Sequence, residues 1–125
     1  MNETLPARIH EMFPRYVKAL ENLIRIPSIS FDNFDQNEVL RSANAVKDLF
    51  ESQGFENAQF LTPPSGRPSV FAELKTNPKN PTILLYAHHD VQPTMREALW
   101  VSAPFVPEIR NGRLYGRGAA DDKSG

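Results

Sequence analysis

A short apolar run, Thr82 to Ala87, places the tightest constraint on how this chain folds. The run follows the turn-like segment KTNPKNP and offers apolar side chains to both faces of an extended strand. Such a strand is expected in the middle of a sheet that other elements cover on both sides. The run therefore predicts an α/β fold in which residues 82–87 form a central strand.

A helix is predicted near the start of the chain, over residues 7–26. Apolar side chains there recur at spacings of three and four, which places them in one stripe along a helix. Pro14 has no N–H to donate, so we expect the regular part of the helix to begin at Pro14, after looser turns. Pro27 is expected to end the helix.

A second helix and several strands are predicted farther along the chain. Residues 37–53 carry another apolar stripe and run into Gly54, a residue type that commonly follows a helix end, with Phe55 placed to pack back on the last turn. Asn111 and Gly112 together favour a tight hairpin turn. Strands are expected at 58–61, 69–74 and 82–87, followed by a hairpin at 106–115.

Composition and charge narrow the classes of partner. The chain has 125 residues, of which 40% are hydrophobic and 23% charged, as in an ordinary globular domain. Its formal net charge of -1 argues against binding to nucleic acid or acidic membranes and favours a small neutral or mixed-charge substrate. MNETLPARIH lacks the layout of a signal peptide, and the strongest apolar run is too short to span a bilayer. We therefore expect a soluble, cytoplasmic protein.

Candidate site residues directly follow the predicted central strand. In open α/β sheets, ligands bind beyond the carboxyl ends of such strands, and His88, His89 and Asp90 occupy this place. In extended geometry His88 and Asp90 point the same way, and His89 points the opposite way. A metal-bound imidazole is oriented by a carboxylate on its second nitrogen, so Asp90, or a carboxylate from elsewhere, could support His88 as a ligand. The alternative is an ordinary solvated turn.

Asp121 and Asp122 form a second candidate cluster, in the glycine-bracketed loop GRGAADDKSG. Adjacent carboxylates repel each other unless a cation or base intervenes, although one of them could instead lie at a helix amino end. The segment from Gly116 to Asp121 imitates a dinucleotide-binding turn, but Asp121 stands where that motif needs glycine, so we reject nucleotide binding. Because the chain has no cysteine, a metal would take its ligands from His, Asp and Glu.

Three segments in this order, LLYAHHDVQP, EALWVSAPF and NGRLYGRGAADDKSG, resemble the amino-terminal third of the co-catalytic zinc peptidases of the M20 family. LIRIPSIS, which follows the first predicted helix, is similar to that family as well. The resemblance implies the amino-terminal part of a zinc-peptidase catalytic domain, with two helices followed by strands of a central mixed sheet. It also implies that the rest of this domain and an inserted dimerisation domain lie outside residues 1–125, and that the full-length protein is a homodimer.

The same resemblance implies roles for individual residues. His88 would ligate one zinc ion, Asp121 would bridge two, and Asp90 would be a supporting catalytic carboxylate close to His88. Asp122 is not expected to be a ligand, and its peptide bond with Asp121 is expected to be cis. Manganese or cobalt could replace zinc. The remaining ligands and a proton-shuttling glutamate are expected after Gly125, so residues 1–125 alone should neither hydrolyse peptides nor hold zinc tightly.

The activity implied by the resemblance is hydrolysis of amide bonds in dipeptides or small peptides by a water that two zinc ions activate. The Asp-Val-Gln-Pro form favours the dipeptidase branch of the family, which includes carnosinase-like enzymes. Two alternatives stay open. One is an N-acyl amino acid deacylase with the same metal centre, and the other is a non-catalytic binding module that kept the fold and lost the site.

Overall fold

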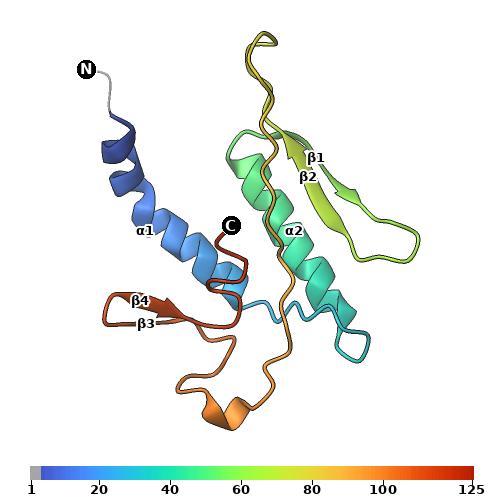
Figure 1. The fold of residues 1–125 in the computed structure, drawn as a ribbon, viewed down its shortest axis with the longest axis vertical. Coiled ribbons are helices and arrows are strands. Elements are labelled where there is room, and N and C mark those ends of the chain that lie inside the picture. Colours follow the sequence, from blue (N-terminus) through green and yellow to red (C-terminus); the bar gives the residue numbers. More distant parts are fainter. Residues whose placement is uncertain (1–3) are drawn as a thin grey trace.

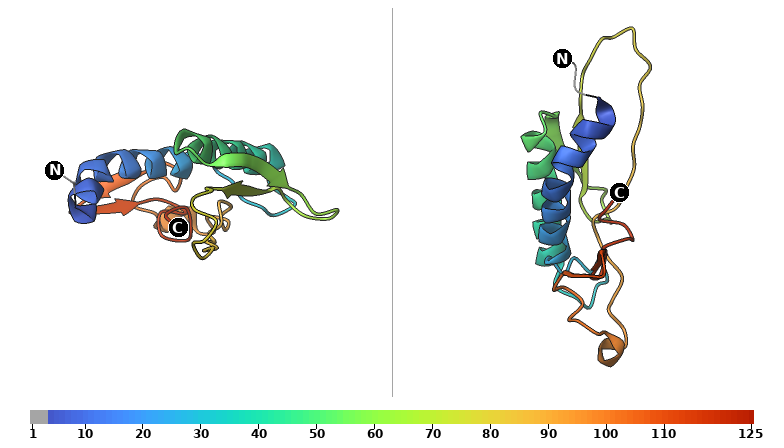
Figure 2. Two further views of the ribbon diagram at one scale, coloured as in Figure 1. Left: turned by 90° about the horizontal axis from the view of Figure 1, so that it is seen from above. Right: turned by 90° about the vertical axis from the view of Figure 1, so that its left-hand side faces the viewer.

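The computed structural model describes residues 4–125. It contains two helices, α1 (Leu5–Ile24) and α2 (Gln36–Ser52), two antiparallel strand pairs, and a short 3-10 turn, η1 (Glu97–Leu99). None of the helices in residues 4–125 has the length and apolar character needed to cross a bilayer. The helices form one layer, and the strand pairs and long connecting segments lie on one side of it (Figures 1 and 2). The chain is therefore α/β in class, as the sequence predicts.

Helix α1 begins earlier than the sequence predicts. It runs through Pro14, and a second proline, Pro6, lies in its first turn. The N–H groups of a first turn have no partner within the helix, so Pro6 starts the helix without losing a hydrogen bond. Pro14 removes one backbone hydrogen bond from a helix of 20 residues. The expectation that regular helix starts at Pro14 is therefore wrong, because one lost bond does not unwind the turns before it.

Helix α2 agrees closely with its predicted range of 37–53. Asp35 caps its amino end by accepting a hydrogen bond from the N–H of Asn37 at 3.0 Å. At the other end Gly54 has a φ of 82°, and the N–H of Phe55 donates to the carbonyl of Phe50 at 3.1 Å. The two phenylalanine rings pack with their centroids 5.0 Å apart, so the predicted packing of Phe55 on the last turn is confirmed.

Strands β1 (Glu56–Leu61) and β2 (Ser69–Glu73) form an antiparallel pair that lies against α2. The pair overlaps the strands predicted at 58–61 and 69–74. Most of β1 is exposed, so the pair contacts the rest of the chain mainly through α2.

Strands β3 (Glu108–Arg110) and β4 (Arg113–Tyr115) form the second antiparallel pair. Asn111 and Gly112 connect them with φ angles of 50° and 73°, and positive φ at both positions is what a tight two-residue hairpin turn requires. The hairpin predicted at 106–115 is therefore confirmed, with shorter strands than the predicted range.

Residues 82–87 do not form the predicted central strand. They run as an extended segment (Figure 1) that pairs with no strand of residues 4–125, and the side chains from Ile83 to Tyr86 are 78–86% exposed. A strand needs a neighbour to pair its N–H and C=O groups, and both strand pairs of the described chain lie elsewhere. The strand predicted at 82–87 is therefore not formed among residues 4–125, because the described strands do not supply its neighbours.

The buried core lies where the end of α1, the segment that follows it and α2 meet residue Val91. Val91 forms a parallel β-bridge with Ile29, and two serines, Ser28 and Ser42, are completely buried beside it. This core supports the residues just before Val91, which include the candidate site. Its apolar members are Leu23, Ile24, Ile26, Ile29, Val39, Ala43 and Val91.

Candidate metal centre

Backbone contacts fix the short segment that carries the first candidate residues. The N–H of Val91 donates to the carbonyl of Ser28 at 2.9 Å, next to the β-bridge between Ile29 and Val91. The carbonyl of His89 accepts two further hydrogen bonds, from the hydroxyl of Ser28 at 2.7 Å and from that of Ser42 at 3.2 Å. The segment is thus tied to the chain after α1 and to α2 at the same time.

The structure brings the three predicted site residues, His88, Asp90 and Asp121, into contact. Nδ1 of His88 lies 3.1 Å from Oδ1 of Asp90 and 3.0 Å from the Asp90 carbonyl oxygen. Nε2 of His88 lies 3.1 Å from Oδ1 of Asp121, which comes from the loop at the other end of the sequence. Each nitrogen of the imidazole therefore faces a different carboxylate.

The protonation of His88 follows from these contacts. Burial lowers its pKa, but the hydrogen bonds and charges of Asp90 and Asp121 outweigh burial, so the net pKa is raised above the usual value for histidine. Both ring nitrogens can donate to carboxylates only when the ring is protonated. The contacts with Asp90 and Asp121 therefore favour the protonated ring, in which both nitrogens donate.

His89 points away from this cluster, as its neighbouring position predicts. Its Nε2 lies 3.1 Å from the carbonyl oxygen of Pro68, to which it donates as an N–H. Burial lowers its pKa below the usual histidine value. His89 is therefore a neutral side chain that packs against the segment before β2.

Asp122 contacts the same segment from a different side. Its Oδ2 accepts a hydrogen bond from the backbone N–H of His88 at 3.3 Å. The peptide bond between Asp121 and Asp122 is cis, as expected. The two carboxylates therefore have different partners: Asp121 contacts the imidazole of His88, and Asp122 its backbone.

Sequence reasoning missed Lys123, which anchors the Asp121 loop. Its side chain is 7% exposed, and its Nζ donates to the carbonyl oxygens of Leu23 at 2.7 Å and Ile26 at 2.9 Å. Burial lowers its pKa from 10.5 to about 8. Lysine is seldom buried, and no local pattern in the loop signals a contact with residues about a hundred positions earlier.

Sequence reasoning also missed Ser30. Its hydroxyl donates to Oδ2 of Asp90 at 2.5 Å, so both carboxylate oxygens of Asp90 have partners. Ser30 lies in the LIRIPSIS segment, whose only signal in the sequence is its similarity to the M20 family. No spacing rule connects a serine to a carboxylate 60 residues away.

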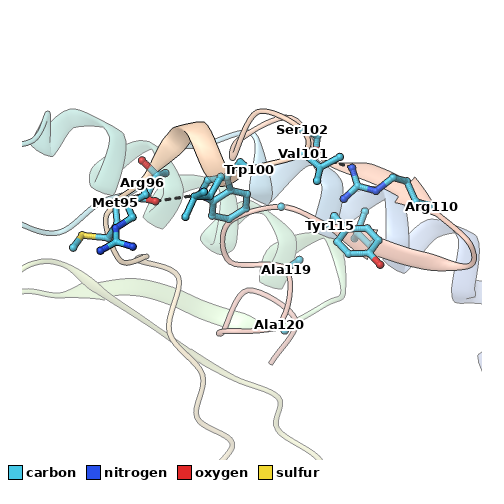
Figure 3. Close-up of a pocket in the computed structure, with 13 residues that line it drawn as sticks. Met95, Arg96, Trp100, Val101, Ser102, Arg110, Tyr115, Ala119 and Ala120 are labelled. Atoms are coloured by element: carbon cyan, nitrogen blue, oxygen red, sulfur yellow. Dashed lines mark hydrogen bonds between the residues drawn. The ribbon is translucent and has the colours of Figure 1, made fainter.

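An open hollow of about 810 Å³ lies beside the loop that leads to Asp121. Figure 3 shows Trp100 and Tyr115 among its lining residues, with Ala119 and Ala120 on the loop side. Trp100 is held by a hydrogen bond from its Nε1 to the carbonyl of Thr94 at 3.1 Å. The hollow therefore adjoins the loop of the candidate site through small side chains.

The donor set can be tested against zinc, the metal that the family resemblance implies. Nitrogen and carboxylate oxygen are good zinc ligands, and a carboxylate on Nδ1 leaves Nε2 of His88 available to a metal. Among residues 4–125, however, no group of three or more His, Asp or Glu side chains is close enough to hold a metal ion. The residues present fit part of a zinc site and supply fewer ligands than a complete one needs.

Comparisons with known proteins find similar peptidases. Residues 84–125 match the model of peptidase family M20/M25/M40. The chain is 32% identical to the Cys-Gly metallodipeptidase DUG1 of Candida albicans, over 92% of this chain and 26% of that protein. It is 35% identical to the Beta-Ala-His dipeptidase of Rattus norvegicus, over 82% of this chain and 20% of that protein.

Solved structures give the same result. The crystal structure of human carnosine dipeptidase 1 is similar with a TM-score of 0.80 and 29% identity, over 93% of this chain and 26% of that one. The chain thus spans about a quarter of the length of the relatives it matches. The resemblance inferred from the sequence is confirmed: residues 84–125 match the M20/M25/M40 peptidase family, and the chain is similar in fold to the corresponding part of human carnosine dipeptidase 1.

Proposed function

We propose that the whole protein is a zinc-dependent dipeptidase in which His88 and Asp121 bind the metal and Asp90 orients His88. The observation that carries this proposal is the 3.1 Å approach of His88 Nε2 to Asp121 Oδ1, while Nδ1 of the same ring faces Asp90. The three relatives described above are dipeptidases by name, which supports the choice of substrate class.

Asp90 decides which nitrogen of His88 is free to bind a metal. When Nδ1–H donates to Asp90, the lone pair of Nε2 points toward Asp121. A metal ion bound here would be held by a deprotonated Nε2 together with the carboxylate of Asp121. The negative charge of Asp90 also makes the imidazole a stronger ligand. Asp90 therefore acts on the reaction through the ring that it holds.

Asp121 supplies a carboxylate that can face two metal ions at once. Two zinc ions, when bound, polarise the scissile carbonyl and lower the pKa of a water molecule. A zinc site usually needs about four ligands, and this chain covers only about a quarter of its relatives' length. We therefore assign the remaining ligands and a proton-shuttling glutamate to other parts of the whole protein.

The first experiment measures bound zinc and hydrolysis in the full-length protein. We expect stoichiometric zinc after dialysis and faster cleavage of dipeptides than of N-acetyl or N-succinyl amino acids. Faster cleavage of the N-acyl substrates would favour the deacylase. Zinc binding without hydrolysis of any of these substrates would favour a binding module.

Substitution of His88 tests the assigned site directly. We expect His88→Ala to lose zinc and to lower kcat/KM by about a hundredfold or more, since it removes a metal ligand. His10→Ala is the matched control, because His10 is exposed on α1 and far along the chain from the loop. Unchanged metal content and activity in His88→Ala would overturn the assignment.

The finer properties of the whole protein are part of the same proposal. We propose zinc as the resident metal, with manganese and cobalt as competitors that reactivation of the metal-free enzyme distinguishes. We also propose a cytoplasmic homodimer that acts on small peptides. Light scattering of the full-length protein tests the dimer, and a monomer would contradict it. Fractionation of cells tests the cytoplasmic location, and a secreted protein would contradict that.

A further inference from the structure

The carboxylate of Asp90 is held at both of its oxygens. Oδ1 lies 3.1 Å from Nδ1 of His88, and Oδ2 accepts a hydrogen bond from the hydroxyl of Ser30 at 2.5 Å. Hydrogen bonds from a hydroxyl to an ionised carboxylate are short and about twice as strong as neutral ones. The contact between Ser30 and Asp90 is therefore among the stronger polar contacts of the site.

A second partner limits how Asp90 can move. A carboxylate with a single hydrogen bond can rotate about its last side-chain bond, where the torsional preference is broad. With Ser30 on Oδ2, the plane of the carboxylate is fixed, and Oδ1 stays directed at Nδ1 of His88. Loss of the Ser30 hydroxyl would free this rotation and would leave Nδ1 with a less constant partner.

Ser30 is itself well supported. Ile29, its neighbour, forms the β-bridge with Val91, and the carbonyl of Ser28 accepts the N–H of Val91 at 2.9 Å. Arg67 donates to the carbonyl oxygen of Ser30 at 3.3 Å. The hydroxyl of Ser30 is thus presented to Asp90 by a backbone segment that is paired on one side and hydrogen-bonded on the other.

We propose that Ser30 is a positioning residue that orients Asp90 and, through Asp90, keeps His88 with its proton on Nδ1. The proposal rests on the proposed function only in that Nε2 of His88 is taken as the ligating atom. Ser28 offers a comparison, because its hydroxyl binds the backbone carbonyl of His89 and touches no carboxylate. A residue that merely supports the segment should behave like Ser28.

The test uses the full-length protein with four substitutions: Ser30→Ala, the conservative Ser30→Thr, the comparison variant Ser28→Ala, and Ser52→Ala as a control at an exposed position on α2. The zinc dissociation constant is measured by competition with a chelator, and thermal unfolding is measured on metal-free protein. We expect Ser30→Ala to weaken zinc binding by about tenfold, the range seen when partners of a metal ligand are removed. Ser30→Thr should restore it.

The kinetic parameters should divide in the same way. Ser30→Ala should lower kcat with little change in KM. Ser28→Ala, in contrast, should lower the melting temperature of the metal-free protein and leave its zinc affinity largely unchanged. Ser52→Ala should match the unsubstituted protein in every measurement. Zinc affinity of Ser30→Ala within about twofold of the unsubstituted protein would overturn the proposal, and so would equal loss in Ser28→Ala.

A readout on metal-free protein separates this inference from the proposed function. Nitrogen NMR of the His88 ring reports which nitrogen carries the proton in the neutral form. We expect Nδ1–H in the unsubstituted protein and an increased share of Nε2–H in Ser30→Ala. If His88→Ala keeps its zinc, the proposed function fails, yet the NMR result still decides the role of Ser30. An unchanged ring in Ser30→Ala overturns that role.

Discussion

The ammonium group of Lys123 donates to the carbonyl oxygen of Leu23 at 2.7 Å, at the carboxyl end of α1. Carbonyl groups there carry the partial negative charge of the helix, which favours a cation. The contact joins the loop of Asp121 to a helix 100 residues earlier in the chain. The position of Asp121 relative to His88 therefore depends on α1, although α1 contributes no site residue.

Lys123 should make the stability of metal-free protein depend on pH. Burial lowers its pKa to about 8 in the folded chain, from 10.5 for an ordinary lysine. Between these values the unfolded chain binds more protons, so the free energy of unfolding should rise as pH rises from about 8 to 10.5. Urea unfolding of the full-length protein at several pH values, with chelator present, measures this rise. Lys123→Met should lack it, and an equal rise in both proteins would contradict the expectation.

Two glycines with positive φ should differ in their tolerance of alanine. A Cβ on Gly118 would lie 2.8 Å from Cγ1 of Val91, whereas a Cβ on Gly112 would have no neighbour within 4 Å. Both substitutions carry backbone strain, which we put at about 1–2 kcal/mol. Gly118→Ala adds crowding worth about 1–3 kcal/mol. Denaturant unfolding of both variants should show the larger loss for Gly118→Ala, and equal losses would refute the packing argument.

Removing the charge of Asp90 should weaken metal binding. Asp90→Asn keeps the shape of the side chain but lowers the basicity of His88. It also allows the NH2 group of the new amide, in place of an oxygen, to face Nδ1. We expect zinc affinity of the full-length protein to fall by about tenfold or more. Asp48→Asn, at an exposed position on α2, is the control. Chelator competition measures both, and an unchanged dissociation constant for Asp90→Asn would argue against its role.

Residues 1–125 prepared alone should self-associate and bind zinc weakly. Leu84 and Leu85 are 84% and 85% exposed, and exposed apolar runs of this kind promote association. Replacement of both by lysine should reduce light scattering without changing the weak zinc binding, since neither residue contacts the site. Tight stoichiometric zinc in the isolated segment, or scattering that the lysines leave unchanged, would contradict this expectation.

The sequence predicts local structure well because local structure depends on nearby residues. A few neighbouring positions are enough to predict the apolar stripe of α2, the Asn111-Gly112 turn and the opposite directions of His88 and His89. The features that the sequence did not predict depend on contacts between residues that are far apart in the sequence. The strand at 82–87 needs neighbours that residues 4–125 do not provide, and the contacts of Ser30 and Lys123 join positions that only the folded chain brings together.

The two buried hydroxyls on the carbonyl of His89 also select between two adjacent histidines. Side chains alternate along an extended segment, so a slip of one residue past Ile29 would bring His89 toward Asp121 and turn His88 away. The buried side chain of Val91 favours the observed alignment, because a slip of one residue would move it out of the core. Ser28 and Ser42, bound to one particular carbonyl oxygen, accept a single alignment. The two hydrogen bonds therefore help to fix the alignment of the segment, and this alignment decides which imidazole enters the site.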